Sequence, residues 1–365
     1  MGSKIVLELK HGRDNPRNSE GAFITLSGGR VLYAYTRYYG RSWHDEATAV
    51  IAGRYSADGG RTWAARDSVL VEDEGGCNVM SVSLLRLQDG RIALFYLRKN
   101  SGNDCRAYMR ISDDEAETWS RPVLTIPAPG YFVTNNDRVI QLRSGRLVVP
   151  ATFHRSRLAV RRGVGHGADS RGIFMMFLSD DGGKTWRESA DWWALPVKSD
   201  SGLQEAGAVE LRNGDVYGWS RTTTGRQWEL RSKDGADTWT PPEPSRFQAP
   251  CSPLSIKRIP ATGDLLAVWN DHHTRWRHLP GVRGARYAES NWGRTPLTTA
   301  ISGDDGRTWR RHKAIETDPR RGFCYTAMHF TDDAVLLAYC CGGRHGAVLQ
   351  DACIRRITLD WLLKT

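Results

Sequence analysis

One eight-residue phrase recurs five times along this chain and restricts the folds that the chain can adopt. Written Ser-x-Asp-x-Gly-x-x-Trp, it occupies Ser56–Trp63, Ser112–Trp119, Ser179–Trp186, Ser232–Trp239 and Ser302–Trp309. Ala116 and Ala236 replace the glycine in two of the copies. The spacing between copies, beyond that of most short repeats, suits a four-stranded unit with loops of variable length. One phrase per unit predicts the blades of a β-propeller.

The residue types within the phrase indicate a structural role. An aspartate can accept hydrogen bonds from the backbone N–H groups of its own turn, and glycine supplies a positive φ where the chain reverses. The tryptophan is then expected to anchor the turn by packing between two sheets. None of these groups is a reagent, so we interpret the phrase as a turn that holds each blade in place.

A second repeat is a β-hairpin ahead of each phrase, with two apolar runs around a glycine-bearing turn. The five hairpins read GAFITLSGGRVLYAYTR, SVSLLRLQDGRIALFYLRK, RVIQLRSGRLVVPATFH, AGAVELRNGDVYGWSR and SPLSIKRIPATGDLLAVWN, and a sixth, CYTAMHFTDDAVLLAYCC, has no phrase after it. We therefore predict an all-β chain: residues 1–365 as a single six-bladed β-propeller domain with four-stranded antiparallel blades. The N-terminal segment KIVLELK is expected to close the last blade.

Composition narrows the function classes. No apolar run has the length of a membrane span, no secretion leader is visible, and the seven cysteines contain no Cys-x-x-Cys pair. A cytoplasmic protein with reduced thiols is expected. The net charge of +10 permits an anionic ligand, but Lys and Arg are scattered singly as on a solvated surface. The cluster of Asp271, His272, His273 and His278 matches no firm metal-ligand spacing. We expect no metal, organic cofactor, nucleic acid or membrane partner, and the oligomeric state stays open.

The register of the hairpins predicts where a site would lie. Each hairpin turns at one face of the disc, so the residues before its first strand and after its second strand meet at the opposite face. Before the first strands these are Glu20, Asn78, Asp137, Glu205, Ser252 and Tyr325, and after the second strands Arg37, Lys99, His154, Arg221, Asp271 and His272. Polar groups at nearly every equivalent position predict a functional pit on the propeller axis.

Three of these positions carry distinctive chemistry. Tyr325 and Glu205 would bring a phenol beside a carboxylate, the general form of an activated nucleophile. Asp45, in the loop after the first hairpin, is a candidate general acid and base. Arg221 and Arg294 are candidates for binding a ligand carboxylate through paired hydrogen bonds.

These residues and phrases resemble the sialidase (neuraminidase) superfamily over essentially the whole chain. The resemblance implies a retaining glycosidase in which Tyr325 is the nucleophile, Glu205 activates it and Asp45 is the acid and base. It implies that Arg221 and Arg294 are two of three arginines that bind a sugar carboxylate, and that Arg37 is an additional arginine found in some members. A neutral phenol suits an anomeric centre that lies beside a carboxylate.

The chain departs from the family at its first motif. Where sialidases carry Arg-Ile-Pro, this chain has NSEGAFITL, which places Glu20 where the first of the three arginines is expected. An Arg-Ile-Pro string does occur at Arg258–Pro260, but it falls in the turn of the fifth hairpin, on the other face. Glu20 is expected to accept hydrogen bonds from sugar hydroxyls, and Asp137 to join it in binding substrate.

The leading hypothesis is a sialidase-like exo-glycoside hydrolase that releases a terminal acidic sugar, sialic acid or a related one. A hydrolase or lyase for uronic-acid glycans, with Tyr325 or one of His44, His154 and His272 as base, is a second possibility. A carbohydrate-binding propeller without catalysis is a third. Sugar products separate the first two, and binding without release of sugar from any glycoside would favour the third.

Overall fold

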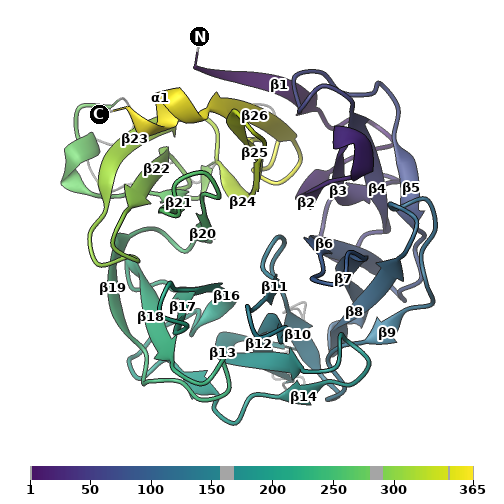
Figure 1. Ribbon diagram of the computed structural model, residues 1–365, viewed down its shortest axis with the longest axis horizontal. Coiled ribbons are helices and arrows are strands. Elements are labelled where there is room, and N and C mark those ends of the chain that lie inside the picture. The colour runs from purple at the N-terminus through teal and green to yellow at the C-terminus, as the bar shows by residue number, and fades with distance from the viewer. Residues whose placement is uncertain (1, 157–167, 280–290, 344–345, 365) are drawn as a thin grey trace.

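The computed structural model describes residues 2–156, 168–279, 291–343 and 346–364. Antiparallel sheets stand around a central axis in a propeller-like ring, and the first strand of each hairpin lies nearest the middle (Figure 1). The described strands form four sheets of four strands and one sheet of ten. The prediction of an all-β propeller is therefore confirmed.

The four-stranded sheets follow the order of the chain, apart from the sheet that joins the two chain ends. The first is β2 (Asn18–Thr25), β3 (Val31–Tyr38), β4 (Ala49–Ser56) and β5 (Ser68–Val71). The next are β16 (Gln204–Glu210), β17 (Val216–Arg221), β18 (Arg226–Ser232) and β19 (Glu243–Gln248), then β20 (Ser255–Arg258), β21 (Leu265–Asn270), β22 (Leu297–Ser302) and β23 (Arg310–Glu316).

The ten-stranded sheet departs from the predicted arrangement of separate four-stranded blades. It contains β6 (Asn78–Arg86), β7 (Ile92–Ser101), β8 (Asp104–Ser112), β9 (Val123–Leu124), β10 (Tyr131–Val133), β11 (Ile140–Gln141), β12 (Leu147–Ser156), β13 (Ala168–Ser179), β14 (Arg187–Glu188) and β15 (Trp193–Ala194). The short strand β10 pairs antiparallel with β12 and parallel with β8, and so joins what we predicted as the second and third blades. Three residues are too few to show a strand period in the sequence.

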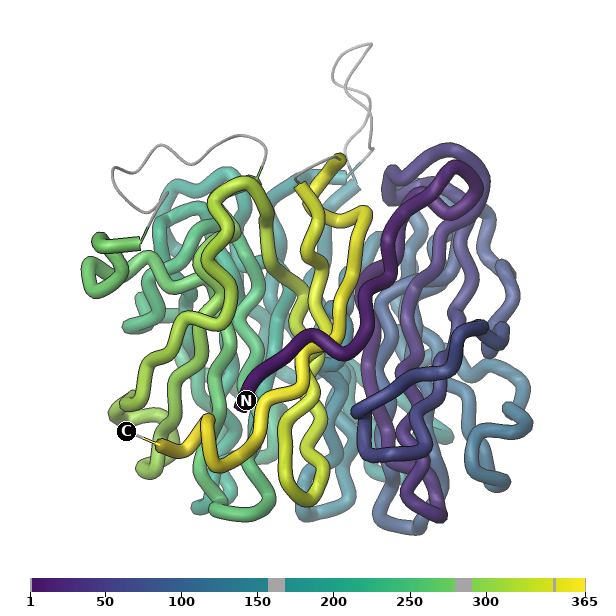
Figure 2. The backbone as a smooth tube through the Cα atoms, turned by 90° about the horizontal axis from the view of Figure 1, so that it is seen from above, coloured from purple at the N-terminus to yellow at the C-terminus, as the bar shows by residue number. Residues whose placement is uncertain are grey.

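The sheet that joins the two ends of the chain consists of β1 (Ser3–Leu9), β26 (Ala352–Thr358), β25 (Ala334–Cys340) and β24 (Cys324–Phe330). β1 runs antiparallel to β26, with Lys4 opposite Arg356 and Leu9 opposite Ala352. Figure 2 shows the N-terminal and C-terminal segments side by side. The short helix α1 (Leu359–Leu363) follows β26 directly. This pairing ties the first strand of the chain to the last strand.

The repeated phrase forms the same hydrogen-bonded turn in each copy. In the first copy, Asp58 Oδ1 accepts from the backbone N–H of Thr62 at 2.8 Å, and Asp58 Oδ2 accepts from the Thr62 hydroxyl at 2.6 Å. The Ser56 hydroxyl accepts from the Gly60 N–H at 2.9 Å, and Gly60 has a φ of 80°. Ala116 and Ala236 take the same left-handed conformation, with φ of 68° and 72°. The turn is thus retained where alanine replaces glycine, at a local conformational cost.

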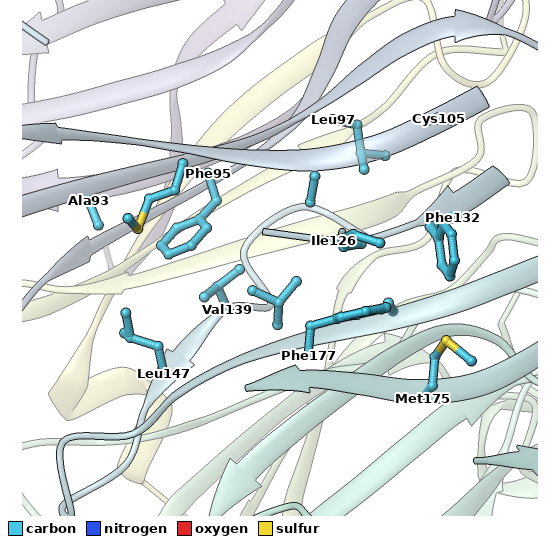
Figure 3. Packing of buried hydrophobic residues seen from close by; sticks show 14 of the residues in the cluster. Ala93, Phe95, Leu97, Cys105, Ile126, Phe132, Val139, Leu147, Met175 and Phe177 are labelled. Carbon is cyan, nitrogen blue, oxygen red and sulfur yellow. The ribbon is translucent and has the colours of Figure 1, made fainter. Parts of the chain in front are cut away.

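The tryptophans of the phrase pack between neighbouring sheets, as predicted. Trp119 lies against a cluster from the β2–β5 sheet and β6–β7, and Trp239 against one from β12–β13 and β16–β18. Another cluster fills the space between β7–β8 and β12–β13 and includes Phe95, Phe132 and Phe177 (Figure 3). The apolar contacts between blades therefore fix the orientation of the hairpins that carry the site.

Because the turns of the repeated phrase are held by hydrogen bonds to aspartate carboxylates, we expect the protein to lose stability in acid. The Thr118 hydroxyl and N–H lower the pKa of Asp114 to about 2, and the same two groups of Thr308 do so for Asp304, against a usual value of 3.8. Because these pKa values are depressed in the folded state, their contribution is complete above pH 4 and is lost as the pH falls towards 2. Urea unfolding at steps between pH 5 and pH 2 should show this fall.

The double variant Asp114→Asn, Asp304→Asn should be less stable at neutral pH and should lose less stability between pH 4 and 2. Asp14→Asn, at an exposed position outside the phrases, is the matched control and should keep the wild-type pH dependence. An unchanged acid response in the double variant would contradict the role given to these carboxylates.

All seven cysteines are free thiols, and most of them are buried. Along the described ranges, no helix has both the length and the apolar character needed to span a membrane.

Candidate active site

A repeated backbone irregularity turns side chains toward the propeller axis. In the inner strands β2, β6, β16 and β24, two residues face a single residue of the neighbouring strand, and the first of the two has a positive φ. These residues are Glu20 (55°), Ser81 (59°), Glu205 (50°) and Tyr325 (58°). Such bulges re-aim a side chain, and a left-handed conformation in a residue other than glycine is costly. The same strained bulge in four sheets brings four polar side chains to one place.

These four residues line one pit of about 210 Å³. Its other lining residues are Asp45, Met80, Leu97, Cys105, Tyr131, Val133, Asn135, His154, Gln204 and Arg221. The pit is smaller than the pockets that hold drug-sized ligands, and suits one small polar molecule or a single sugar ring.

Tyr325 and Glu205 form a direct pair near the starts of the inner strands β24 and β16. The Tyr325 hydroxyl donates to Glu205 Oε1 at 2.9 Å, and both side chains are more than nine-tenths buried. Burial raises the pKa of Tyr325 well above its usual value, Glu205 raises it further, and Arg221 and Arg294 act in the opposite direction. The phenol therefore stays protonated in the resting protein, and its proton already points to a carboxylate.

Arg221 and Arg294 lie beside this pair and share an acceptor. Arg221 Nη2 is 3.0 Å from Glu205 Oε1, and its Nη1 donates to the Cys251 carbonyl at 3.1 Å. Arg294 donates to Cys324 Sγ at 2.9 Å and to the same Cys251 carbonyl at 3.4 Å, and its guanidinium lies over the Tyr325 ring. Arg221 lines the pit, whereas Arg294 supports Tyr325 from outside it.

Arg17 is a central residue of the site that sequence reasoning missed. It is only 1% exposed, and its guanidinium bridges two acids, with Nη2 2.8 Å from Glu20 Oε1 and Nη1 2.5 Å from Asp45 Oδ1. Its side chain also stacks on the Tyr38 ring. Arg17 stands three residues before Glu20, so the acid at the family's arginine position could have signalled a compensating base nearby.

Glu20 and Asp45 therefore lie at one side of the pit, held by a single cation. Glu20 Oε2 accepts from the Ser81 hydroxyl at 2.7 Å. Burial raises the pKa of Glu20, and the Arg17 charge and the Ser81 hydrogen bond act against that rise. The Asp45 side chain is 55% exposed, so it lies at the rim of the pit.

The strand β10, which the sequence did not predict, adds Tyr131 and Val133 to the pit beside His154, which the sequence analysis placed there. Tyr131 is opposite His154 in the β10–β12 pairing, and the two rings meet edge to face at 6.0 Å. Nδ1 of His154 is 2.8 Å from the Asp169 carbonyl, an acceptor only, so Nδ1 carries the proton and Nε2 is the acceptor. Burial lowers the pKa of His154, which keeps the ring neutral. The buried Lys99 amine lies over the Tyr131 ring and 3.1 Å from Glu46.

Arg37 does not reach the pit, contrary to the sequence-based expectation. Alternation along β3 directs Thr36 toward the axis, where its hydroxyl accepts from the Ser81 N–H, and sends Arg37 to the other side of the sheet. There Arg37 Nε is 3.8 Å from Asp67, in a surface depression that Lys10 and Arg66 also line.

Asp137, which we expected to bind substrate, also lies outside the lining of the pit. It has the positive φ of the other inner residues, 58°, but its carboxylate is bound to Lys257 Nζ at 2.6 Å and to the Met328 N–H at 2.8 Å. It ties the segment before β11 to β20 and β24. Asn78 is displaced in a similar way, because the bulge of β6 falls three residues later, at Ser81.

The arrangement can perform nucleophilic substitution at a carbon held in the pit. A phenol with a hydrogen-bonded carboxylate supplies a nucleophile and its base, and a carboxylate at the rim can exchange a proton with a leaving group. In the described ranges, no group of three or more His, Cys, Asp or Glu side chains is arranged to hold a metal ion.

Comparison with known proteins agrees with the fold. Residues 78–337 match the family described as BNR repeat-like domain. A protein of unknown function from Dyadobacter fermentans superposes with a TM-score of 0.71 at 19% identity, covering 98% of this chain and 99% of that one. The NanB sialidase of Streptococcus pneumoniae gives 0.69 at 14% identity, over 99% and 71% of the two chains.

The intramolecular trans-sialidase of Ruminococcus gnavus superposes with a TM-score of 0.70 at 16% identity, over 100% of this chain and 99% of the other. Identities this low bear on the fold alone, whereas the family match covers most of the sequence. The fold is therefore similar to that of these sialidases, and the chain belongs to the BNR repeat-like domain family.

Proposed function

We propose that this protein is a retaining exo-glycoside hydrolase that releases one terminal sugar, with Tyr325 as nucleophile. The observation that carries the proposal is the 2.9 Å hydrogen bond from the Tyr325 hydroxyl to Glu205, inside a pit the size of one sugar ring. We also infer the number of blades. If β10 joins two blades within the ten-stranded sheet, that sheet and the four four-stranded sheets together form a six-bladed propeller.

In the first step, the Tyr325 oxygen attacks the anomeric carbon and forms a bond to it while the bond to the leaving oxygen breaks. The phenol proton passes to Glu205, along the hydrogen bond already present. Asp45 is exposed at the rim and exchanges protons with solvent, and in its protonated form it gives that proton to the leaving oxygen. Arg17, 2.5 Å from Asp45, stabilises the negative charge that this transfer leaves behind.

In the second step, water attacks the anomeric carbon of the glycosyl-tyrosine from the side of Asp45. Asp45 takes the proton of the water, the bond to Tyr325 breaks, and Glu205 returns its proton to the phenolate. Two substitutions at one carbon restore the original anomeric configuration, and the protein ends in its starting protonation state.

The charge of the sugar is a separate question from this mechanism. The sequence favours an acidic sugar, sialic acid or a related one, and Arg221 at the wall of the pit supports that choice. Arg294 lies outside the pit, and the pit is also lined by the acids Glu20 and Asp45. The mechanism holds for a sugar of either charge.

A panel of chromogenic glycosides tests the proposal. It should contain sialosides, glucuronides, galacturonides and neutral hexosides in both anomeric forms. Wild-type protein should release the chromophore from at least one member, and Glu205→Gln should lower kcat on it by roughly 10²- to 10⁴-fold because the base is lost. The matched control is Glu243→Gln, at an exposed position in β19, which should keep wild-type activity.

The alternatives give other results. Release of an unsaturated sugar would indicate a lyase that acts on uronic-acid glycans. A panel without any cleavage by wild-type protein, together with hits on a glycan array, would contradict the proposal and favour a binding propeller.

A further inference from the structure

The charges around the pit are already paired within the protein. Arg17 is the cation nearest to the position where an arginine is expected from the family resemblance, yet its two terminal nitrogens donate to Glu20 and Asp45. Its Nε donates to Ser19 at 2.9 Å, and the side chain does not line the pit. Glu20 therefore meets Arg17 in the way that a ligand carboxylate would.

The remaining arginines of the site have their terminal nitrogens engaged, and only the buried Nε atoms of Arg221 and Arg294 find no acceptor among the described residues. Arg221 has one terminal nitrogen against Glu205 and the other on the Cys251 carbonyl, and Arg294 is bound to Cys324 and to that carbonyl from outside the pit. A carboxylate placed in the pit would meet Arg221 alone among the described arginines, and it would face the carboxylates of Glu20, Asp45 and Glu205. Opposed like charges in a confined site are costly.

Several polar atoms of the pit call for a ligand that both donates and accepts. Glu205 Oε2 is buried and receives no hydrogen bond from the described residues, and His154 Nε2 is fixed as an acceptor. Asn135 is 1% exposed, its oxygen accepts from the Asn136 N–H, and its amide nitrogen finds no acceptor among the described residues. A hydroxyl can satisfy atoms of both kinds, whereas a carboxylate can only accept.

We propose that the Glu20 carboxylate, paired with Arg17, takes the place of the carboxylate that an acidic sugar would bring. The pit therefore selects a neutral, hydroxyl-rich glycosyl residue. The proposal rests on the proposed function in taking a sugar as the ligand. It makes Glu20 the residue that determines the charge of the substrate. It also gives a role to the left-handed conformation of Glu20, which turns the acid into the pit.

Matched pairs of sugars test this selection by isothermal titration calorimetry on the full chain. Methyl glucoside is compared with methyl glucuronide, methyl galactoside with methyl galacturonide, and N-acetylneuraminic acid is added as the acid typical of sialidases. Wild-type protein should bind at least one neutral glycoside, and should bind it at least roughly tenfold more tightly than its acidic partner. Glu20→Gln should narrow that ratio severalfold. Glu243→Gln, which removes an exposed carboxylate that does not line the pit, is the control and should keep the ratio.

Tighter binding of N-acetylneuraminic acid or of either uronide by wild-type protein would overturn the proposal, as would the absence of binding by any of the five sugars. The wild-type ranking decides even if Glu20→Gln does not fold. The results also distinguish failure of the proposed hydrolase function from failure of this proposed sugar selection. If the sugars bind in the expected order but no panel member is cleaved, the proposed hydrolase activity is wrong and the selection of a neutral sugar stands. If only sialosides are cleaved, and cleavage depends on Tyr325, the hydrolase activity stands and the selection of a neutral sugar is wrong.

Discussion

Tyr325→Phe should lower kcat by roughly 10³-fold or more on whichever glycoside the wild-type protein cleaves, because the substitution removes the attacking oxygen. The fold should survive, since phenylalanine keeps the ring under the Arg294 guanidinium and Glu205 retains its ion pair with Arg221. We expect the unfolding free energy to change by about 1 kcal/mol, the usual value of one hydrogen bond. Steady-state kinetics and urea unfolding of the same preparation measure both quantities.

The chain offers a matched control in a second buried tyrosine–glutamate pair. The Tyr217 hydroxyl donates to Glu229 at 2.7 Å in the β16–β19 sheet, and neither residue lines the pit. Tyr217→Phe should cost a similar amount of stability and leave kcat unchanged. Equal losses of activity in the two variants would mean that Tyr325 acts through the fold and not through its oxygen.

Arg17→Leu should destabilise the protein by roughly 3–5 kcal/mol at neutral pH, because it leaves the Glu20 carboxylate buried without its cation. Glu20 is 5% exposed and Arg17 is 1% exposed, so water cannot replace the lost partner. Chemical denaturation at pH 7 measures the loss. Adding Glu20→Gln to Arg17→Leu should recover part of it, because the unpaired charge is then gone.

Arg30→Leu is the control for this prediction. Arg30 also pairs with a glutamate, Glu117, at 3.1 Å and lies over the Tyr55 ring, but it is largely exposed. Its replacement should cost less than about 1 kcal/mol, as for other surface ion pairs. A loss of that small size for Arg17→Leu would contradict the buried pair as the anchor of Glu20 and Asp45.

The sequence predicts the propeller and half of the site for the same reason: both depend on local repeats. The phrase around Asp58 and the hairpins recur with a readable period, and the period places Glu20, Glu205 and Tyr325 at equivalent points of their strands. The structure adds that each of these residues is the left-handed residue of a bulge. A bulge shifts the register without changing the apolar pattern, which explains why Asn78 was predicted in place of Ser81.

The features that the sequence did not predict depend on contacts between distant segments. The pairing of Arg17 with Asp45 crosses 28 residues of chain. The contact between Tyr131 and His154 depends on a three-residue strand with no visible period. Arg37 was assigned from family position, and the alternation of β3 turns it away from the axis. Local patterns thus define the blades, whereas contacts between segments distant in the sequence define the arrangement of the candidate site.

In the proposed mechanism, the Tyr325 oxygen becomes bonded to the sugar during turnover. The direct measurement is mass spectrometry of the protein quenched during reaction with a glycoside of the cleaved sugar that carries fluorine next to the anomeric carbon and a good leaving group, so that the intermediate breaks down slowly. We expect one glycosyl group per chain, on the peptide that contains Tyr325, and none in Tyr325→Phe. A glycosyl group on Glu20, Asp45 or Glu205, or turnover that inverts the anomeric configuration without any adduct, would contradict the account.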